Sequence, residues 1–347
     1  MKTRITELLG IKYPIIQSGM GLVADSTLVI GTCNAGGLGI LSAWSSTPEG
    51  LRKTIREIRQ SVGDKTFGVN LVPFQPGYKK YLDVMLEERV PMLNSGLRDP
   101  FSLVGMKKPG NVIYIATVGN VRQAVRVEKA GADAVIVQGL EAGGHAGKIA
   151  SVVLIPEVVK VVKIPVIAAG GFCDGKGLAA ALALGAEGIA MGTRFAVTQE
   201  SPLPPQLKSK YLEARDNDAV LSTVWDGLDM RAIPGQKIKR YHGWWTRFWE
   251  IIPTFLYMKK AYNASLRELM GTARLVRQVH APPIQFMVGM EMFRRGVENG
   301  ELDRSILIAG QVVGRVEDIP TCHQLIERTV AEAEQVLKDL HSKLALL

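Results

Sequence analysis

The feature that most constrains the fold is a series of short apolar segments in the first part of the chain, with helical intervals between them. The segments are rich in β-branched residues, and most of them end in Gly, Ser, Thr or Asn. They are residues 14–19, 38–43, 67–72, 91–96, 112–117, 132–139, 164–171 and 188–195. Strands that are apolar on both faces are typical of a parallel sheet covered by helices.

The intervals between these segments carry helix signals. Residues 47–62 begin with Thr-Pro and then repeat apolar residues at helical spacing. Gly131 and Gly185 each follow a helical stretch and are plausible stop signals. Eight strand–helix units predict a closed (β/α)8 TIM barrel. An open, doubly wound sheet is the alternative fold.

The pattern changes after residue 201. Residues 202–285 are proline-spotted, basic and aromatic, whereas residues 286–347 are expected to form helices, the last over residues 321–346. We therefore expect a barrel domain from residues 1–201 and 286–347. Residues 202–285 are expected to be a helical insertion or lid over the active site.

The net charge of +9 is concentrated in one window, residues 231–277. This window holds ten lysines and arginines against two glutamates, and it contains Trp244, Trp245 and Trp249. Such a segment favours an anionic partner, or it is a solvated helical face. Because no recognition motif accompanies the tryptophans, we expect no nucleic-acid partner. Binding to a membrane surface is a further alternative.

The cysteines and the N-terminus bear on the compartment. Cys33, Cys173 and Cys322 are widely spaced, so we expect reduced thiols, no disulfide and no metal site. Cys173 has no base beside it in sequence, and we interpret it as a structural thiol. The first residues lack the pattern of a signal peptide, and no apolar run is long enough to span a membrane. A cytoplasmic location is expected.

In a (β/α)8 barrel, ligands bind where the strands end. Gly170-Gly171 follows the seventh strand and Gly192-Thr193 follows the eighth. Glycines let backbone N–H groups approach an anion, so these two loops predict a phosphate site. Residues 19–24 match the loose dinucleotide fingerprint G-x-G-x-x-A, but the next strand lacks the acidic residue that this motif requires.

The loop after the sixth strand reads EAGGHAG and places His145 among glycines. On local sequence alone this residue is either a loop histidine bonded to a neighbouring carbonyl group or a catalytic group.

Taken together, PIIQSGM, NAGGLGIL, FGVN, VIVQGLEAGGHAG, IPVIAAGGFCDG and GAEGIAMGTRF resemble the nitronate monooxygenase family. They are equally similar to the related flavin-dependent enoyl-acyl-carrier-protein reductases. The resemblance covers about residues 1–200 and returns in IAGQVVG at 308–314. It implies non-covalently bound FMN, with its phosphate on the seventh and eighth loops. The reductase branch also implies NAD(P)H as a co-substrate.

The resemblance also implies a role for each matching residue. His145 falls on the family's catalytic histidine. The residues implied to contact FMN are Gly19 and Met20 beside the ring, Asn70 at the ring edge, and Gln138 at the ribityl chain or ring. Gly143 and Gly144 would lie in the loop close to the flavin, Gly170, Gly171, Gly192 and Thr193 would bind its phosphate, and Gln311 would close the pocket.

The function implied by the resemblance is the oxidation of alkyl nitronates by O2, with His145 as an acid–base or substrate-orienting residue. The first alternative is NAD(P)H- and FMN-dependent reduction of the C=C bond of an enoyl-CoA thioester. The layout after the barrel is similar to a branch that reduces CoA-linked intermediates of steroid-ring degradation. In that case Lys259, Lys260, Arg274 and Arg277 are the candidates for binding the CoA phosphates. A homodimer is left open.

Overall fold

The structure is a computed structural model, and it describes residues 1–96, 99–238, 252, 255–256, 259–260, 265–278 and 281–344. Trp244, Trp245 and Trp249 lie outside the described residues, as do Lys239, Arg240 and Arg247 of the basic window.

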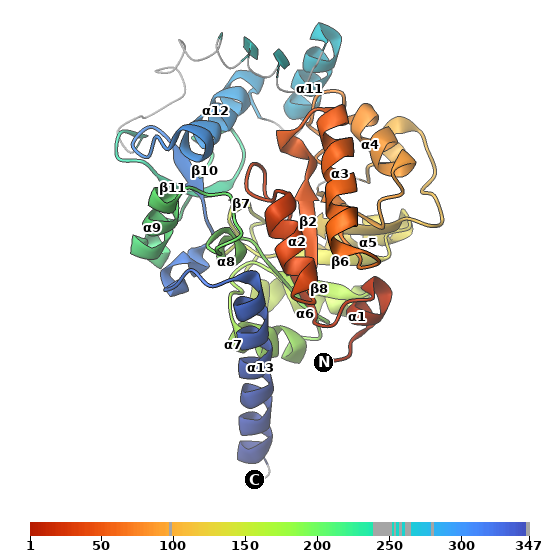
Figure 1. Cartoon of the computed structure of the whole chain (residues 1–347), viewed down its shortest axis with the longest axis vertical. Coiled ribbons are helices and arrows are strands. Elements are labelled where there is room, and N and C mark those ends of the chain that lie inside the picture. Colours follow the sequence, from red (N-terminus) through yellow and green to blue (C-terminus); the bar gives the residue numbers. More distant parts are fainter. Residues whose placement is uncertain are drawn as a thin grey trace.

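Eight parallel strands form a closed barrel, as the apolar segments predict (Figure 1). The strands are β1 (Ile15–Gln17), β2 (Leu38–Ser42), β3 (Gly68–Asn70), β4 (Met92–Gly96), β5 (Ile113–Val118), β6 (Ala134–Gln138), β8 (Val166–Ala169) and β9 (Ile189–Met191). Strand β1 pairs with β2 on one side and with β9 on the other. Because the first and last strands pair, the open doubly wound sheet is excluded.

Helices cover the outside of this barrel. They are α2 (Ser26–Asn34), α3 (Pro48–Val62), α4 (Tyr78–Glu87), α5 (Val121–Lys129), α6 (Ser151–Val161), α7 (Gly175–Ala183) and the short α8 (Thr193–Ala196). Between β4 and β5 the described chain forms only the 3-10 turn η2 (Ser102–Val104). Thr47 caps α3 by accepting a hydrogen bond from the N–H of Gly50, as its sequence predicts. The eighth strand is shorter than expected, because the backbone turns helical at Thr193.

The barrel interior is filled by apolar side chains that include Ile16, Ile40, Ile136 and Ile167, each at most 4% exposed. Helix α1 (Arg4–Leu9) supplies Ile5 to the same cluster and so closes the amino-terminal end of the barrel. The interior is therefore a packed core, and only the carboxyl end of the strands is available for binding.

A second, antiparallel sheet lies beside this carboxyl end. It contains β7 (Gly144–His145), β10 (Val220–Ser222), β11 (Met230–Pro234) and β12 (Ile306–Ile308). Strands β10 and β11 belong to the segment that the sequence predicts to be helical, so that expectation is corrected. Neither strand lies in a continuous apolar run like those that mark the barrel strands, several of which are equally short.

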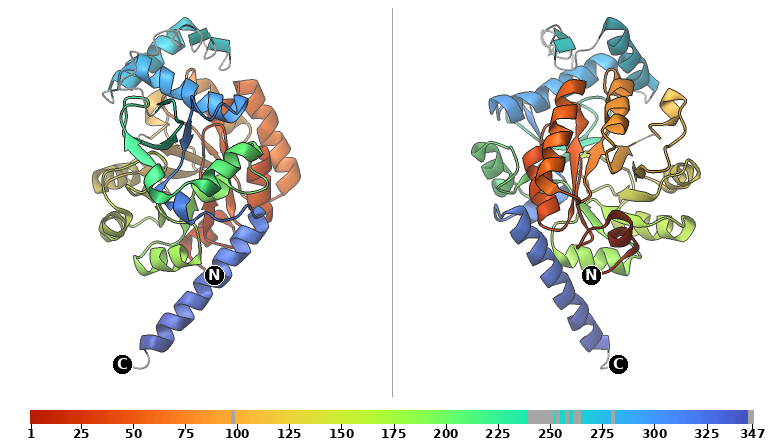
Figure 2. Two further views of the ribbon diagram at one scale, coloured as in Figure 1. Left: turned by 90° about the vertical axis from the view of Figure 1, so that its left-hand side faces the viewer. Right: turned by 45° about the vertical axis from the view of Figure 1, so that its right-hand side comes forward.

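Further helices and 3-10 turns follow β9 in the chain. They are α9 (Pro205–Glu213), the turn η3 (Asp216–Asp218), α11 (Leu266–Gln278), α12 (Pro283–Asn299), the turn η6 (Gln311–Arg315) and α13 (Cys322–Leu344). The first half of α13 packs on α7 and α2, and its second half extends beyond the barrel (Figure 2). No helix in the described part of the chain is both long and apolar enough to cross a membrane.

Candidate active site

His145 forms a hydrogen-bonded pair with a buried carboxylate. Its Nε2 atom lies 2.5 Å from Oδ2 of Asp226, which is 81 residues further along the chain. The Asp226 side chain is 2% exposed and the His145 side chain 39%. The other oxygen of Asp226 accepts a hydrogen bond from the N–H of Leu228 at 3.0 Å. The carboxylate is therefore fixed by its surroundings, and one edge of the imidazole faces open space.

The second sheet brings these two residues together. In the antiparallel pairing of β7 with β11, His145 lies opposite Met230 and Gly144 opposite Arg231. The side-chain amide of Gln138 donates a hydrogen bond to the carbonyl oxygen of His145 at 3.2 Å. Asp226 precedes β11 by a short turn, so the pairing of β7 with β11 sets the position of its carboxylate. A lone aspartate far away in the sequence carries no signal for such a contact.

Glycine is required in this loop by a close backbone contact. A Cβ atom on Gly143 would lie 2.6 Å from the carbonyl carbon of Ala309 and from the nitrogen of Gly310. Gly144 has a φ of +72°, in the left-handed region that favours glycine. The glycines of EAGGHAG thus let the 309–311 segment approach the histidine loop. That these glycines also lie close to a flavin remains a prediction.

Two charged residues stabilise the same loop through hydrogen bonds. The Glu141 carboxylate accepts hydrogen bonds from both the N–H and the hydroxyl of Ser151, the first residue of α6. Arg231 donates to the carbonyl oxygens of Leu140 and Ala219, at 3.2 and 2.7 Å. Burial lowers the pKa of Arg231, although the nearby Glu141 carboxylate favours its charged form. Since Arg231 is 6% exposed, it is not part of a basic surface, contrary to the sequence interpretation.

Polar side chains line the ends of three neighbouring strands. The amide nitrogen of Asn70 on β3 donates to Oδ1 of Asn94 on β4 at 2.6 Å, and Asn94 donates to the carbonyl of Ile115 on β5. A Cβ atom on Gly19 would lie 2.5 Å from the Cβ of Asn70. The structure therefore brings together Gly19 and Asn70, which the sequence predicts, and adds Asn94, which the sequence analysis did not identify.

The predicted phosphate loops lie on adjacent strands. Ala169 of β8 is in register with Ala190 of β9, so Gly171 and Gly192 each follow a paired residue by two positions. Gly170 and Gly171 have φ values of +94° and +82°. A Cβ atom on Gly192 would meet the Met20 side chain, with the sulfur at 3.6 Å and Cγ at 4.0 Å. Bare backbone on two neighbouring strand ends fits a single phosphate group such as that of FMN.

The remaining predicted residues join the phosphate loops to the histidine loop. The Thr193 hydroxyl oxygen accepts a hydrogen bond from the N–H of Gly310 at 2.9 Å. The N–H of Gln311 donates to the carbonyl oxygen of Glu141 at 2.9 Å. Segment 309–311 thus contacts both segment 141–143 and Thr193, and the Gln311 side chain is exposed.

The basic candidates lie on a different part of the molecule. Lys259 and Lys260 are exposed, and Arg274 and Arg277 are exposed on α11. Beside them an apolar cleft of about 150 Å³ is lined by residues of α11 and α12, including Leu269, Val276 and Phe286. No described contact joins these cations to His145.

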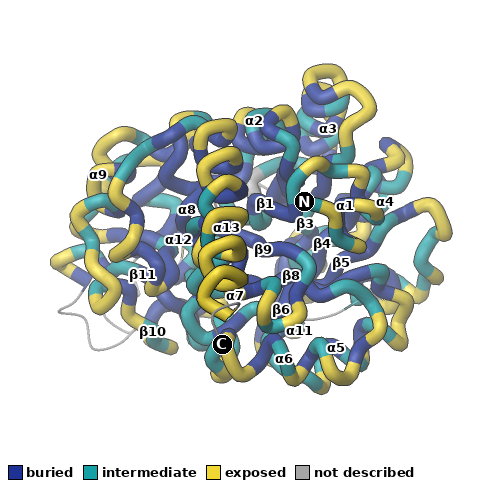
Figure 3. The backbone as a smooth tube through the Cα atoms, turned by 90° about the horizontal axis from the view of Figure 1, so that it is seen from below, coloured by how far each residue is buried: buried dark blue, intermediate teal, exposed yellow. Residues whose placement is uncertain are grey.

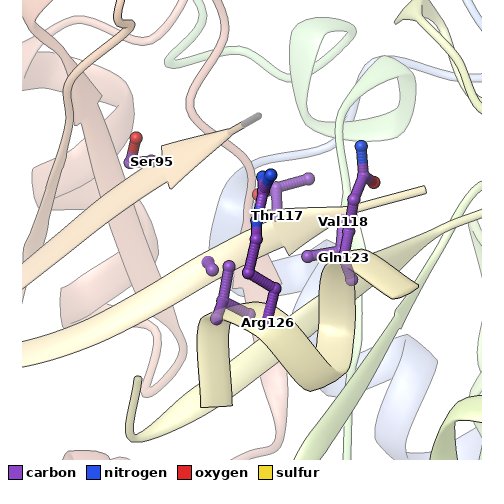
Figure 4. A pocket seen from close by; sticks show the side chains of 7 residues that line it. Ser95, Thr117, Val118, Gln123 and Arg126 are labelled. Carbon is purple, nitrogen blue, oxygen red and sulfur yellow. The ribbon is translucent and has the colours of Figure 1, made fainter. Parts of the chain in front are cut away.

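A second crevice lies between β5 and α5 (Figure 4). Thr117, Gln123 and Arg126 line it, and it has no room for a water molecule. The Gln123 side chain accepts a hydrogen bond from the N–H of Gly119 at 2.8 Å. This crevice is a packing defect and not a second active site.

The thiols are buried and unpaired with one another. Burial raises the pKa of Cys33 and of Cys173 to about 11, and that of Cys322 to about 12. A thiol with such a pKa is a poor nucleophile at neutral pH. Among the described residues, no three His, Cys, Asp or Glu side chains are grouped as metal ligands would be.

Comparisons with known proteins show which family the chain belongs to. The sequence model of the family described as nitronate monooxygenase matches residues 2–80 and 72–332. The (3aS,4S,5R,7aS)-5-hydroxy-7a-methyl-1-oxo-octahydro-1H-indene-4-carboxyl-CoA dehydrogenase of Rhodococcus jostii (strain RHA1) is 36% identical over 363 residues, with 96% of each chain covered. A probable nitronate monooxygenase of Staphylococcus aureus (strain Newman) is 32% identical over 291 residues, with 70% of this chain and 82% of the relative covered.

Among solved structures, FabK from Thermotoga maritima matches with a TM-score of 0.81 and 34% identity, over 99% of both chains. The family match spans most of the chain, and it includes the strand ends, the histidine loop and the segment that carries Asp226. The protein is therefore an oxidoreductase and belongs to the nitronate monooxygenase family.

Proposed function

We propose that this oxidoreductase uses FMN and acts at the carbon atoms next to the thioester carbonyl of a CoA-linked substrate. The observation that carries the proposal is the pairing of His145 with the buried Asp226. A nitronate has already lost the proton from its reacting carbon, so its oxidation needs no base. The α-carbon of a saturated thioester still holds its proton, and a fixed imidazole–carboxylate pair is suited to move it.

In this proposal each ring nitrogen of His145 has its own role. Because a carboxylate can only accept, the Nε2–H of His145 donates to Asp226, and Nδ1 is left to take the α-proton. The Asp226 carboxylate then stabilises the imidazolium. When bound, FMN supplies the acceptor or donor of the hydride at the neighbouring β-carbon. Loss of the α-proton and the β-hydride forms a C=C bond, and the reverse transfers saturate it. NAD(P)H is the proposed co-substrate for saturation of the C=C bond, and NAD(P)+ is the proposed co-substrate for its formation.

The strand ends support FMN as the cofactor. Gly171 and Gly192 offer backbone N–H groups for its phosphate, and Asn70 and Gln138 offer side-chain amides for the ring and the ribityl chain. FMN ends in one phosphate, which two adjacent glycine loops can enclose.

Two further observations support a CoA thioester as the substrate. The CoA-linked relative from Rhodococcus jostii aligns with 96% of this chain, including residues after the barrel. On α11 the arginines Arg274 and Arg277 are exposed and can bind phosphate groups through charge-assisted hydrogen bonds. We propose that Lys259, Lys260 and these arginines hold the CoA phosphates, and that residues 202–285 act as a lid.

The flavin assignment is tested by the spectrum of the purified protein and by chromatography of the released cofactor. We expect FMN. The Gly192→Asp variant should lose it, because a carboxylate would take the place of the phosphate. Gly110→Asp is the control, since Gly110 is exposed and has no atom within contact distance of an added Cβ. Release of FAD, or binding of no flavin at all, contradicts the assignment.

The substrate assignment is tested by steady-state kinetics with an acyl-CoA and with the same acyl group on a short thiol. The double variant Arg274→Ala/Arg277→Ala should raise KM for the CoA ester by roughly 10-fold, the loss expected from about 1.4 kcal/mol of phosphate contacts. The difference from wild type should shrink at high salt, which screens exposed charges. Lys53→Ala/Lys107→Ala removes two exposed cations elsewhere and should leave KM unchanged.

The second candidate function is the oxidation of alkyl nitronates by O2. It is favoured by the family match and by the relative from Staphylococcus aureus. It predicts turnover without NAD(P)H and no response to Arg274 or Arg277. Rapid nitronate oxidation by a protein that does not bind acyl-CoA would replace the thioester proposal with this one.

A further inference from the structure

The outer half of α13 carries an apolar stripe that the barrel does not cover. Along this helix, apolar residues recur at alternating spacings of four and three: Ile326, Val330, Ala333, Leu337, Leu340 and Leu344. The first three are at most 6% exposed. The last three are 38%, 47% and 67% exposed, in the part that extends past the barrel (Figures 1 and 2).

The contact between α13 and the barrel ends in the middle of the stripe. The backbone of Gly175 at the start of α7 lies against Thr329 and Ala333, and the N–H of Gly175 donates to the Glu332 carboxylate at 2.7 Å. Beyond Ala333 the exposed fraction of the stripe residues rises steadily towards the C-terminus. Figure 3 colours the outer part of α13 mostly as exposed. The spacing of the uncovered leucines is that of a helix that packs against a second helix.

We propose that two copies of this chain associate through the outer halves of α13, paired antiparallel. In such a pair, Leu337 of one protomer packs beside Leu340 of the partner subunit, and the two-fold axis repeats this contact. The flanking position next to the leucine stripe is occupied by Glu334 at one end and by His341 at the other. Antiparallel pairing places Glu334 opposite His341 of the partner subunit, twice per dimer, so the helix is complementary to itself.

The polar residues of this segment agree with such an arrangement. Lys338, Asp339 and Ser342 point away from the leucine stripe and remain exposed. Gln335 and Asp339 are hydrogen-bonded to each other at 2.7 Å on this outward face. The outer half of α13 therefore has one apolar face and one solvated face, and the active site at the other end of the barrel stays open.

The mass of the full chain in solution tests this proposal, by light scattering after size exclusion over a wide range of protein concentrations. Wild type should have twice the 37.8 kDa of one chain. Leu337→Asp/Leu340→Asp should have 37.8 kDa, with an unchanged far-UV circular dichroism spectrum, because both leucines are already exposed in one chain. Lys338→Asp/Ser342→Asp alters the outward face of the same turns and should remain dimeric.

A charge exchange tests the antiparallel direction. Glu334→Lys should shift the dimer towards monomer, and adding His341→Glu should restore it. A monomeric wild type overturns the proposal, and so does a dimer that survives Leu337→Asp/Leu340→Asp. Dissociation of the outward-face control, or failure of the double charge exchange to restore the dimer, overturns antiparallel pairing through this stripe.

Discussion

At the scale of single residues, Asp226 decides what His145 can do. A half-exposed imidazole in a glycine-rich loop has many orientations of similar energy, and a carboxylate at 2.5 Å selects one of them. It also selects the tautomer, because Nε2 must carry the hydrogen that the carboxylate accepts. Asp226 does not face the open space itself, so we regard it as a positioning residue.

The variant Asp226→Asn should preserve the fold and flavin content while lowering kcat by about 10²-fold, the lower end of the range for a general acid–base group. The asparagine amide has the same shape but cannot stabilise the imidazolium, so the acidic limb of the pH–rate profile should move to lower pH. KM should change little.

His145→Ala serves as the reference for Asp226→Asn, because it removes the proton-transfer group and should flatten that limb of the profile. A loss of kcat in Asp226→Asn without any change in the shape of the profile would indicate a merely structural aspartate.

The sequence could predict the histidine but not its partner. His145 stands in the glycine-rich motif EAGGHAG, directly after a predicted strand, whereas Asp226 lies in a segment of mixed polarity with no recognisable motif. Arg231 shows the same limit, since counting charges says nothing of depth and the residue is buried. Contacts between residues far apart in the chain depend on strand pairing, which a local pattern does not contain.

At the scale of elements, continuous apolar runs were sufficient to predict the barrel strands, whereas the strands of the second sheet could not be predicted from the sequence. All eight barrel strands follow from residues that are apolar on both faces, as in Ile136 and Val137 of β6. Strand β7 consists of Gly144 and His145 alone. A two-residue strand has no periodicity, and it exists because β11 provides its hydrogen-bonding partner.

The close approach of Gly143 to Ala309 and Gly310 makes an element-scale prediction. Gly143→Ala should reduce the free energy of unfolding by about 1–3 kcal/mol, the usual effect of overpacking, because its Cβ would overlap backbone that has no freedom to move. Turnover should fall with it, since the histidine loop must shift. Urea unfolding and kcat measure the two effects. Gly110→Ala is the matched control, and equal behaviour of the two variants would contradict the proposed contact.

At the scale of the whole molecule, Asp318 connects the last unit of the barrel to the C-terminal helix. Its carboxylate lies 2.6 Å from Arg194 of α8 and 2.7 Å from Arg328 of α13. The Arg194 side chain is 3% exposed. The hydrogen bond from Arg328, together with the charge of Arg194, lowers the pKa of Asp318 below its ordinary value of 3.8.

A carboxyl group with a lowered pKa in the folded state stabilises the fold above its unfolded pKa, and this stabilisation is lost as pH falls through the folded value. Asp318→Asn should therefore lower the free energy of unfolding at pH 7 by about 1–2 kcal/mol. This is less than the ~3–5 kcal/mol typical of a fully buried pair, because the Asp318 side chain is 47% exposed. The difference from wild type should shrink as the pH falls below 3.8 and through the lowered pKa of Asp318, as urea unfolding at each pH can show. A difference independent of pH would exclude the ionic origin.

The 81-residue separation of His145 and Asp226 has a consequence for biosynthesis. On the ribosome, all eight barrel strands emerge before Asp226 and β11 do. Because domains fold as their residues emerge, a nascent barrel can close while its histidine has no carboxylate partner. The His145–Asp226 pair can form only after the post-barrel segment has docked, so, on the proposed mechanism, a chain that ends before Asp226 should lack the chemistry.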